Sequence, residues 1–183
     1  MDAMRAVMKT IWNGITTILV LMVVVLAVLL VGVRLVGYQP FAVLSGSMEP
    51  TYSTGDLIYV KKVDHRELEA GDVITFMLSE NTVATHRIVG VVPDEDDPSV
   101  LRYRTKGDAN DTEDGTLVHY KNILGSPAAI AVPYLGYVAS YISAPPGMYM
   151  AIGVGAMLIL MVFLPDLFED DKKKEQTQEG EPS

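Results

Sequence analysis

The sequence predicts a membrane-anchored protein whose central part is a compact, mostly β module built on an antiparallel sheet. Three observations support this fold class. One charge-free apolar run covers residues 10–33, a second covers residues 148–164, and the segment between them has short β-branched runs separated by Gly-Asp pairs. Because part of the 183 residues must face lipid, the chain leaves room for one small soluble module.

The first apolar run is long enough to cross a bilayer. Residues 10–33 carry no charged side chain and exceed the roughly 20 apolar residues that span a hydrocarbon core. A cleaved secretory signal peptide would have a shorter apolar region of about 7–15 residues. The run therefore predicts a retained transmembrane helix.

The second apolar run is shorter. Residues 148–164 have about the minimum spanning length of ~17 residues, carry no charge, and are followed by Pro165. A helix buried in a soluble core is the alternative interpretation. We predict a second, C-terminal transmembrane helix here.

The cations near these runs predict the topology. Arg5 and Lys9 precede the first run and three lysines at 172–174 follow the second, which favours two cytoplasmic termini and an extracytoplasmic middle. The predicted location is the cell membrane, with two spans. The expected domains are an N-terminus with its transmembrane helix (1–36), a β catalytic domain (37–146), the second helix (147–165) and a disordered polar tail (166–183).

Composition excludes several kinds of site. The formal charge of −9 gives no basic face for nucleic acid, so no nucleic-acid partner is expected. The chain has no cysteine, and therefore no disulfide, thiol nucleophile or thiolate metal site. Neither a phosphate-binding loop nor a metal-ligand spacing is present, so we predict no cofactor and no metal.

Five short runs in the middle segment predict strands, since they combine β-branched and apolar residues between turn residues. No long soluble helix pattern separates them, which favours an antiparallel sheet. Residues 93–98 and 107–115 are predicted loops, and residues 132–142 suit an interfacial stretch at a membrane surface. The runs begin at Asp56, Asp72, Thr82, Ser99 and Ile123.

A candidate nucleophile lies in LSGSMEPTY, shortly after the first apolar run. Ser47 stands between Gly46 and Met48, and a glycine beside a serine permits a tight turn and close approach of a substrate. A turn serine that bonds its own backbone is the alternative. A catalytic serine would also need a base within reach.

His86 is the candidate base. It lies inside the apolar run ATHRIVGVV, where alternation places it on the same face as Ala84 and Ile88. A part-buried imidazole needs polar partners, and a backbone carbonyl is the alternative to Ser47. His65 and His119 follow charged or Gly-rich loops and are interpreted as structural.

An acidic residue would be needed to orient that base and to stabilise its charged form. The run TKGDANDTED supplies several candidates, and the sequence alone leaves the choice open. A calcium loop or a solvated turn is the alternative, but the spacing does not match an EF-hand. The candidates are Asp108, Asp111, Glu113 and Asp114.

These motifs together resemble a known family. The runs SGSMEPTYSTGDLIYV, GDVITF, THRIVGV and YRTKGDANDTED occur in this order between residues 45 and 114. They resemble the type I signal peptidases, in their archaeal and endoplasmic-reticulum branch. The resemblance implies a mostly β catalytic module close to the membrane, without the large inserted domain of some bacterial members.

The resemblance also implies roles for single residues. Ser47 matches the nucleophile, and His86 stands where the bacterial branch carries a lysine. Asp114 matches the aspartate that this branch requires, and Asp108 matches a second, supporting aspartate. For the oxyanion hole we expect the backbone N–H of Ser47 together with the Ser45 hydroxyl.

The implied activity is removal of signal peptides from secreted preproteins by a membrane-anchored serine endopeptidase. The implied partners are preproteins bearing signal peptides, the lipid bilayer and the secretion translocon. Two alternatives stay open. One is a Ser-Lys dyad that uses Lys61, Lys62 or Lys106 as its base, and the other is a non-catalytic module that binds signal segments without cutting them.

Overall fold

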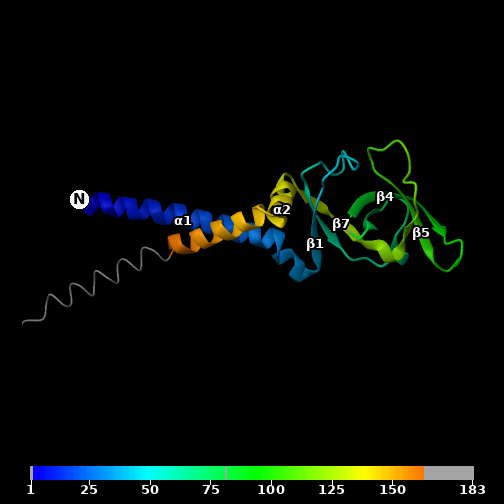
Figure 1. Ribbon diagram of the computed structural model, residues 1–183, viewed down its shortest axis with the longest axis horizontal. Coiled ribbons are helices and arrows are strands. Elements are labelled where there is room, and N and C mark those ends of the chain that lie inside the picture. The colour runs from blue at the N-terminus through cyan, green and yellow to red at the C-terminus, as the bar shows by residue number, and fades with distance from the viewer. Residues whose placement is uncertain (1, 81, 163–183) are drawn as a thin grey trace, which may run out of the picture. The chain divides into compact units, whose positions relative to one another are not determined.

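The computed structural model describes residues 2–80 and 82–162, and its contacts divide the chain into two units. One unit contains residues 30–141 and holds the sheet (Figure 1). The other combines the N-terminal residues 1–29 with the chain from 142 onward. Its last part, including the predicted tail at 166–183, lies outside the described residues.

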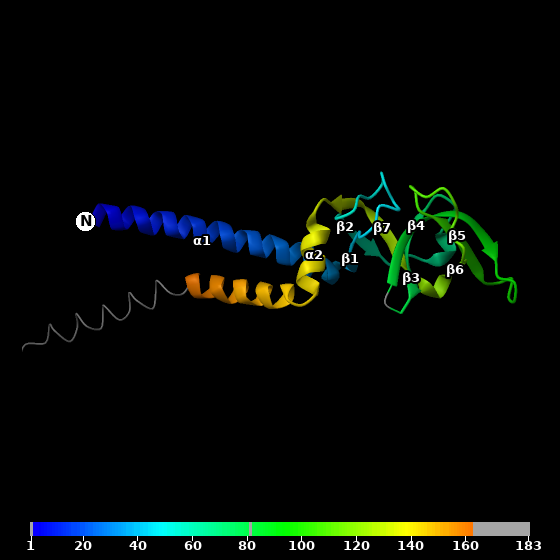
Figure 2. The same cartoon turned by 45° about the horizontal axis from the view of Figure 1, so that its top comes forward.

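Within the described residues, the sheet has seven strands, and every pairing between neighbours is antiparallel (Figures 1 and 2). The order across the sheet is β1-β2-β7-β3-β4-β5-β6. This confirms the mostly β, antiparallel prediction for the module. The strands are β1 (Tyr38–Ala42), β2 (Leu57–Lys61), β3 (Val73–Ser79), β4 (Thr82–Pro93), β5 (Leu101–Lys106), β6 (Val118–His119) and β7 (Ile123–Val132).

Two strands at the ends of the sheet, β1 and β6, were not among the predicted runs. β1 contains Pro40, which has no backbone N–H to donate and is therefore suited to an edge strand, and in the described part of the chain β1 pairs only with β2. β6 has two residues, too few to show a periodic pattern. Short 3₁₀ turns complete the unit: η1 (Gly32–Val36), η2 (His65–Glu67) and η3 (Tyr120–Asn122).

Two clusters of buried side chains stabilise this unit. The larger one fills the space between β3, β4, β5 and β6, and it includes Ile74, Phe76, Ile88 and Tyr103. The smaller one joins Ile58 and Val60 of β2 to Met48 and Tyr52, which follow Ser47 in the chain. The second cluster therefore anchors the candidate nucleophile turn to the sheet.

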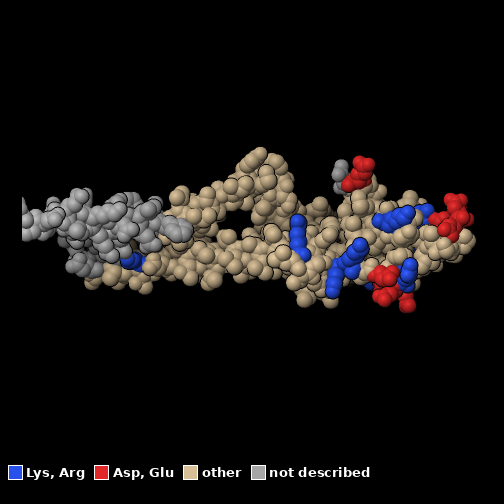
Figure 3. All heavy atoms as spheres, turned by 90° about the horizontal axis from the view of Figure 1, so that it is seen from below, with Lys and Arg blue, Asp and Glu red and all other residues tan. Residues whose placement is uncertain are grey.

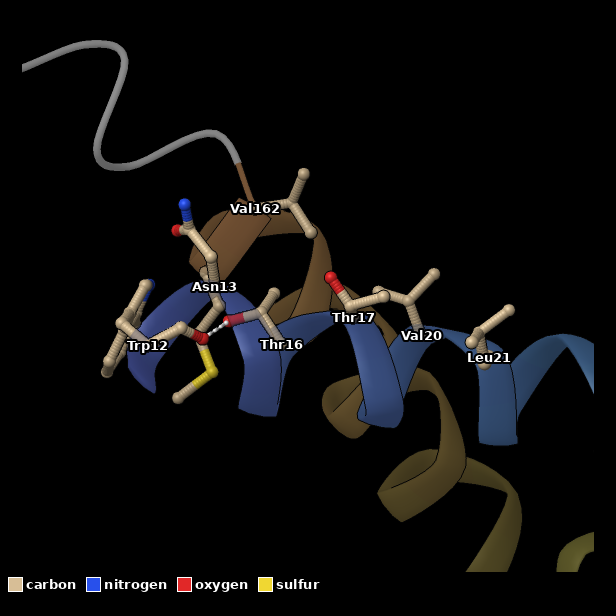
Figure 4. Close-up of a pocket in the computed structure, with 8 residues that line it drawn as sticks. Trp12, Asn13, Thr16, Thr17, Val20, Leu21 and Val162 are labelled. Atoms are coloured by element: carbon tan, nitrogen blue, oxygen red, sulfur yellow. Dashed lines mark hydrogen bonds between the residues drawn. The ribbon is translucent and has the colours of Figure 1, made fainter. Parts of the chain in front are cut away.

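The helix α1 (Asp2–Leu30) includes a segment, Ala6–Leu30, that is long and apolar enough to cross a membrane. Two of its threonines bond the helix backbone. The hydroxyl of Thr16 donates to the carbonyl of Trp12, as Figure 4 shows in a hollow of this unit, and Thr10 bonds Ala6 in the same way. Such back-bonding satisfies a hydroxyl without water.

The described part of the predicted second span, residues 148–162, is helical. α2 (Leu135–Ser143) covers most of the predicted interfacial stretch, and a second helix follows at Gly147–Val162. The two satisfy the length and composition of a span only when taken together. Residues 163 and 164, at the end of the predicted run, lie outside the described part.

Charged side chains are unevenly distributed between the two units. In the view of Figure 3, the Lys, Arg, Asp and Glu side chains of the described residues gather over the sheet unit. The described helices of the other unit show almost none. An unpaired charge is costly in hydrocarbon, so this distribution suits helices that contact lipid.

Candidate active site

The candidate nucleophile lies in a tight turn at residues 45–52, between β1 and β2. The Glu49 N–H donates to the Gly46 carbonyl at 3.0 Å, and the Tyr52 N–H donates to the Met48 carbonyl at 3.0 Å. Met48 is 2% exposed and belongs to the smaller core cluster. Burial of Met48 thus holds the turn in place, while Ser47 beside it stays half-buried.

The candidate base lies in the middle of β4. His86 is opposite Ile74 of β3, and its ring meets the ring of the buried Phe76 edge-on, with 6.2 Å between centroids. Ala84 and Ile88, two residues to either side, both contact the larger core cluster. His86 therefore shares the face of β4 that Ala84 and Ile88 occupy, as predicted. Its imidazole has the apolar core on one side and polar groups on the other.

Ser47, His86 and Asp114 form one hydrogen-bonded chain. His86 Nε2 lies 3.2 Å from Ser47 Oγ, and His86 Nδ1 lies 2.7 Å from Asp114 Oδ2. Because an ionised carboxylate can only accept, the ring proton belongs on Nδ1, which leaves Nε2 to accept from the serine hydroxyl. The Ser45 hydroxyl lies 3.2 Å from Ser47 Oγ and can donate to it.

The four acidic candidates have different surroundings. Asp114 contacts His86, whereas Glu113 pairs with Arg104 at 3.6 Å on the surface. Asp111 is exposed in the same loop. Asp108 bonds Arg87 and Thr51 instead of the imidazole. Among the described residues, Asp114 is thus the acid that can orient His86.

Asp108 joins three segments around the site. Arg87 of β4 donates to both of its carboxylate oxygens, at 2.8 Å to Oδ1 and 2.7 Å to Oδ2. The Thr51 hydroxyl, at the end of the nucleophile turn, also donates to Oδ2. Arg87 further donates to the Gly71 carbonyl at 2.8 Å. These bonds connect the acidic loop, the nucleophile turn and the base strand.

The hydrogen bonds from Arg87 are the main cause that lowers the pKa of Asp108 below its usual range. Burial acts in the opposite direction, while the Thr51 hydroxyl and the Arg87 charge lower the pKa further. The carboxylate is therefore held in its charged form.

The acidic loop also contacts the backbone of the nucleophile. The Ala109 N–H donates to the Ser47 carbonyl at 2.9 Å. At Gly107, a Cβ atom would lie 2.5 Å from that same carbonyl oxygen, which is backbone and cannot rotate away. Glycine at 107 thus permits the loop to approach Ser47, and the bond from Ala109 fixes the orientation of the Ser47 peptide.

A cleft of about 610 Å³ opens beside the hydrogen-bonded chain. Its polar lining includes Ser45, Ser47, Thr82, Thr85, His86 and Asn110. Its walls are formed by the end of β1 with the following residues, at 41–45, and by the start of β4, at 82–86. A chain segment that enters this cleft would therefore pass both Ser47 and His86.

The other histidines and the candidate lysines make different contacts. His65 and His119 both stack on Tyr120, with ring centroids 4.4 and 4.5 Å apart, as expected for structural histidines. Lys61 lies over the ring of Tyr38 at 5.7 Å. In the described part of the chain, the hydrogen bonds of Ser47 Oγ lead to His86 and Ser45, and none leads to a lysine.

Three residues at the site were missed by sequence reasoning: Arg87, Thr51 and Thr105. Arg87 follows His86 directly, and strand alternation turns it to the opposite face, where only the fold reveals Asp108. Thr105 is fully buried, and its hydroxyl donates to Asp114 at 2.6 Å. A threonine within a strand run is unremarkable by composition, so no sequence signal marked it.

Within residues 2–80 and 82–162, no group of three or more His, Cys, Asp or Glu side chains is placed to hold a metal ion. Ser47 and His86 line the cleft, and the Asp114 carboxylate bonds His86 from outside it, which is an arrangement that can move a proton away from a serine.

Asp108→Asn is expected to lower the free energy of unfolding by about 1–2 kcal/mol near pH 7, because an amide cannot accept both hydrogen bonds from the guanidinium. The effect is no larger because Arg87 is partly exposed and water screens its charge. The lowered pKa of Asp108 means that its stabilisation is complete above the unfolded pKa of about 4 and is lost as pH falls through the folded pKa. Thermal unfolding from pH 7 to acid pH measures both effects.

Asp111→Asn is the matched control for this prediction, because it removes an exposed carboxylate from the same loop. Asp108→Asn should unfold at a lower temperature than Asp111→Asn at pH 7. The difference between the two unfolding temperatures should become smaller at acid pH. Equal unfolding temperatures at pH 7 would show that the Arg87 pair contributes nothing to stability.

Comparison with known proteins adds an independent result. The family model described as "Signal peptidase, peptidase S26" matches residues 15–96, which include Ser47 and His86. The chain is 39% identical over 134 residues to Signal peptidase I W of Bacillus subtilis, a match that covers 69% of each chain.

Eukaryotic proteins also match. The signal peptidase complex catalytic subunit SEC11 of Fusarium vanettenii is 32% identical over 129 residues, which cover 65% of this chain and 73% of that protein. Human SEC11C is 31% identical over 104 residues, 52% of this chain and 53% of that protein. On the extent of these matches, the chain belongs to the type I signal peptidase family.

Proposed function

We propose that this protein is a membrane-anchored serine endopeptidase that removes N-terminal signal peptides from secreted preproteins. The observation that carries the proposal is the hydrogen-bonded chain from Ser47 through His86 to Asp114, at 3.2 and 2.7 Å, beside an open cleft. This is the arrangement by which a weak hydroxyl nucleophile is activated and its proton stored.

In the first half of the reaction, Ser47 Oγ attacks the carbonyl carbon of the scissile peptide while His86 Nε2 accepts the hydroxyl proton. The imidazolium that forms is stabilised by the Asp114 carboxylate, which also holds the ring in the tautomer that exposes Nε2. His86 then donates the proton to the leaving amine. The C–N bond breaks, and an ester to Ser47 remains.

In the second half, His86 removes a proton from water, and the oxygen of that water attacks the ester carbonyl carbon. The bond from that carbon to Ser47 Oγ breaks, His86 returns the proton to Ser47 Oγ, and the acid product leaves. The oxyanion formed in each half is stabilised by the Ser47 backbone N–H and by the Ser45 hydroxyl, whose present partner is Ser47 Oγ at 3.2 Å. We assign Asp108 a supporting role, through the bonds that join the loop of Asp114 to Arg87 and Thr51.

The cleft suits an extended substrate. Residues 82–86 of β4 pair with β3 on one side, whereas the pairing with β5 begins at Arg87, so this stretch has an edge that can accept a further strand. The cleft is also lined by Leu44, Leu78 and Val83. Main-chain bonding between apolar walls favours uncharged residues next to the cut.

Anchoring places enzyme and substrate in one bilayer and raises the local concentration of the scissile bond. We propose two spans, α1 and the C-terminal apolar segment, with both termini cytoplasmic and the sheet unit outside. The catalytic domain would cover residues 37–146. Lipid and the secretion translocon are the proposed neighbours. The relatives named as catalytic subunits of a signal peptidase complex show that related chains work within assemblies.

The function is tested by incubating the purified chain in lipid with a signal-bearing preprotein and determining the mass and new N-terminus of the product. We expect a single cut at the signal boundary and no cut with Ser47→Ala. Cutting by both proteins would place the nucleophile elsewhere. If neither folded protein cuts although both bind the preprotein, the chain would instead be a binding module.

A further inference from the structure

Thr105 of β5 is fully buried, yet its side chain is polar and makes a bond to the site. Its hydroxyl donates to Asp114 Oδ2 at 2.6 Å. The same oxygen accepts the Nδ1 proton of His86 at 2.7 Å. One carboxylate oxygen thus receives two donors, one from the base and one from a strand of the sheet.

The backbone adds a second connection between the same two residues. The Asp114 N–H donates to the Thr105 carbonyl at 2.8 Å. Asp114 is therefore held at its main chain and at its side chain by a residue nine positions earlier, although its neighbours Glu113 and Gly115 are exposed. β5 itself is fixed by pairing with β4, where Thr105 lies opposite Ile88.

A carboxylate in an exposed loop can rotate and take its hydrogen bonds from water. Two bonds to a rigid strand remove that freedom, and they place Oδ2 where the imidazole of β4 can reach it. The distance between base and acid is then set by the β4–β5 ladder rather than by the conformation of the loop.

We propose that Thr105 is a positioning residue of the catalytic site, which fixes the Asp114 carboxylate against His86 through its buried hydroxyl. The proposal rests on the proposed function, since it assigns Thr105 a role in the same proton transfer. Thr105 does not line the cleft and does not contact Ser47 among the described contacts, so it acts through Asp114 alone.

This role predicts a specific kinetic effect. Thr105→Val keeps the shape of the side chain and removes the hydroxyl. It is expected to lower kcat for preprotein cleavage about tenfold, the effect of losing one hydrogen bond to a charged group, with KM within about twofold. Thr105→Ser retains the hydroxyl, so its kcat should stay within about threefold of the unchanged enzyme.

A double-mutant cycle separates positioning from a general structural effect. In an Asp114→Ala background, Thr105→Val should cause no further loss of kcat, because the group it positions is absent. Thr75→Val is the matched stability control. Thr75 is also fully buried, and its hydroxyl bonds Thr85 at 2.8 Å, so it reports the cost of losing such a group away from the acid.

The outcomes distinguish this proposal from the function on which it rests. Asp114→Ala with unchanged kcat would refute the assigned acid, and the role of Thr105 with it. Loss of kcat in Asp114→Ala combined with unchanged kcat in Thr105→Val would refute the role of Thr105 alone, as would an equal loss from Thr105→Val in both backgrounds. If Thr105→Val does not fold, Thr105→Ser and Thr105→Ala, which differ only in the hydroxyl, provide the same comparison.

Discussion

His86→Ala is expected to lower kcat for signal cleavage by about 10⁴-fold or more, because the serine hydroxyl loses the group that accepts its proton. The loss of folding stability should be small, since the imidazole lies at the polar edge of the larger core cluster. The measurement is single-turnover cleavage of a preprotein in lipid, with folding checked by thermal unfolding.

His65→Ala is the control for this prediction, because that imidazole stacks on Tyr120 and contacts neither Ser47 nor Asp114 among the described contacts. The His65→Ala variant should cut the preprotein at nearly the rate of the enzyme without substitutions. Retained cleavage by His86→Ala would revive the Ser-Lys alternative and direct attention to Lys61, Lys62 and Lys106. Cleavage by His86→Lys would mean that the site accepts either base.

Asp114→Asn should lower kcat by about 10³–10⁴-fold while KM changes little. An amide can donate to Nδ1, which would move the ring proton to Nε2 and prevent that atom from accepting the serine proton. Asp114 does not line the cleft, so substrate binding should be preserved. Kinetics over a range of preprotein concentrations separate kcat from KM.

The two other aspartates of the loop serve as controls for Asp114→Asn. Asp111→Asn should leave kcat unchanged. Asp108→Asn should lower the unfolding temperature, and its loss of kcat should be smaller than that of Asp114→Asn. A loss of kcat in Asp108→Asn as large as that in Asp114→Asn would indicate that the supporting acid takes part in orienting the base.

The sequence predicted the sheet well where strands are long and apolar. The runs from Asp56, Asp72, Thr82, Ser99 and Ile123 all contain observed strands, because burial requires a continuous set of β-branched and aromatic residues. β1 was missed because Pro40 is typical of a turn until the neighbouring strand is known. α2 was missed as a helix because its aromatic residues are equally typical of an interfacial segment.

The candidate site was predictable in its residue types and less so in its contacts. Motif and strand alternation predicted Ser47 and His86 as nucleophile and base, whereas spacing could not distinguish Asp108, Asp111 and Asp114. That choice depends on two features of the fold, the bonds from Thr105 and the pair with Arg87. Each of these contacts joins a strand residue to a residue of the acidic loop, and the sequence pattern does not show which strand residue faces which acid.

The central claim is that Ser47 and His86 form a nucleophile and its base, and an introduced thiol tests it most directly. The chain has no cysteine, so Ser47→Cys creates a single thiol whose alkylation rate can be followed by mass. A neighbouring imidazole that accepts the proton should make this thiol react about tenfold faster, or more, than the same thiol in a His86→Ala background. Ser79→Cys, an exposed thiol at the end of β3, should react equally in both backgrounds. Faster alkylation at 47 only when His86 is present is the predicted result, and equal rates at 47 in the two backgrounds would contradict the account.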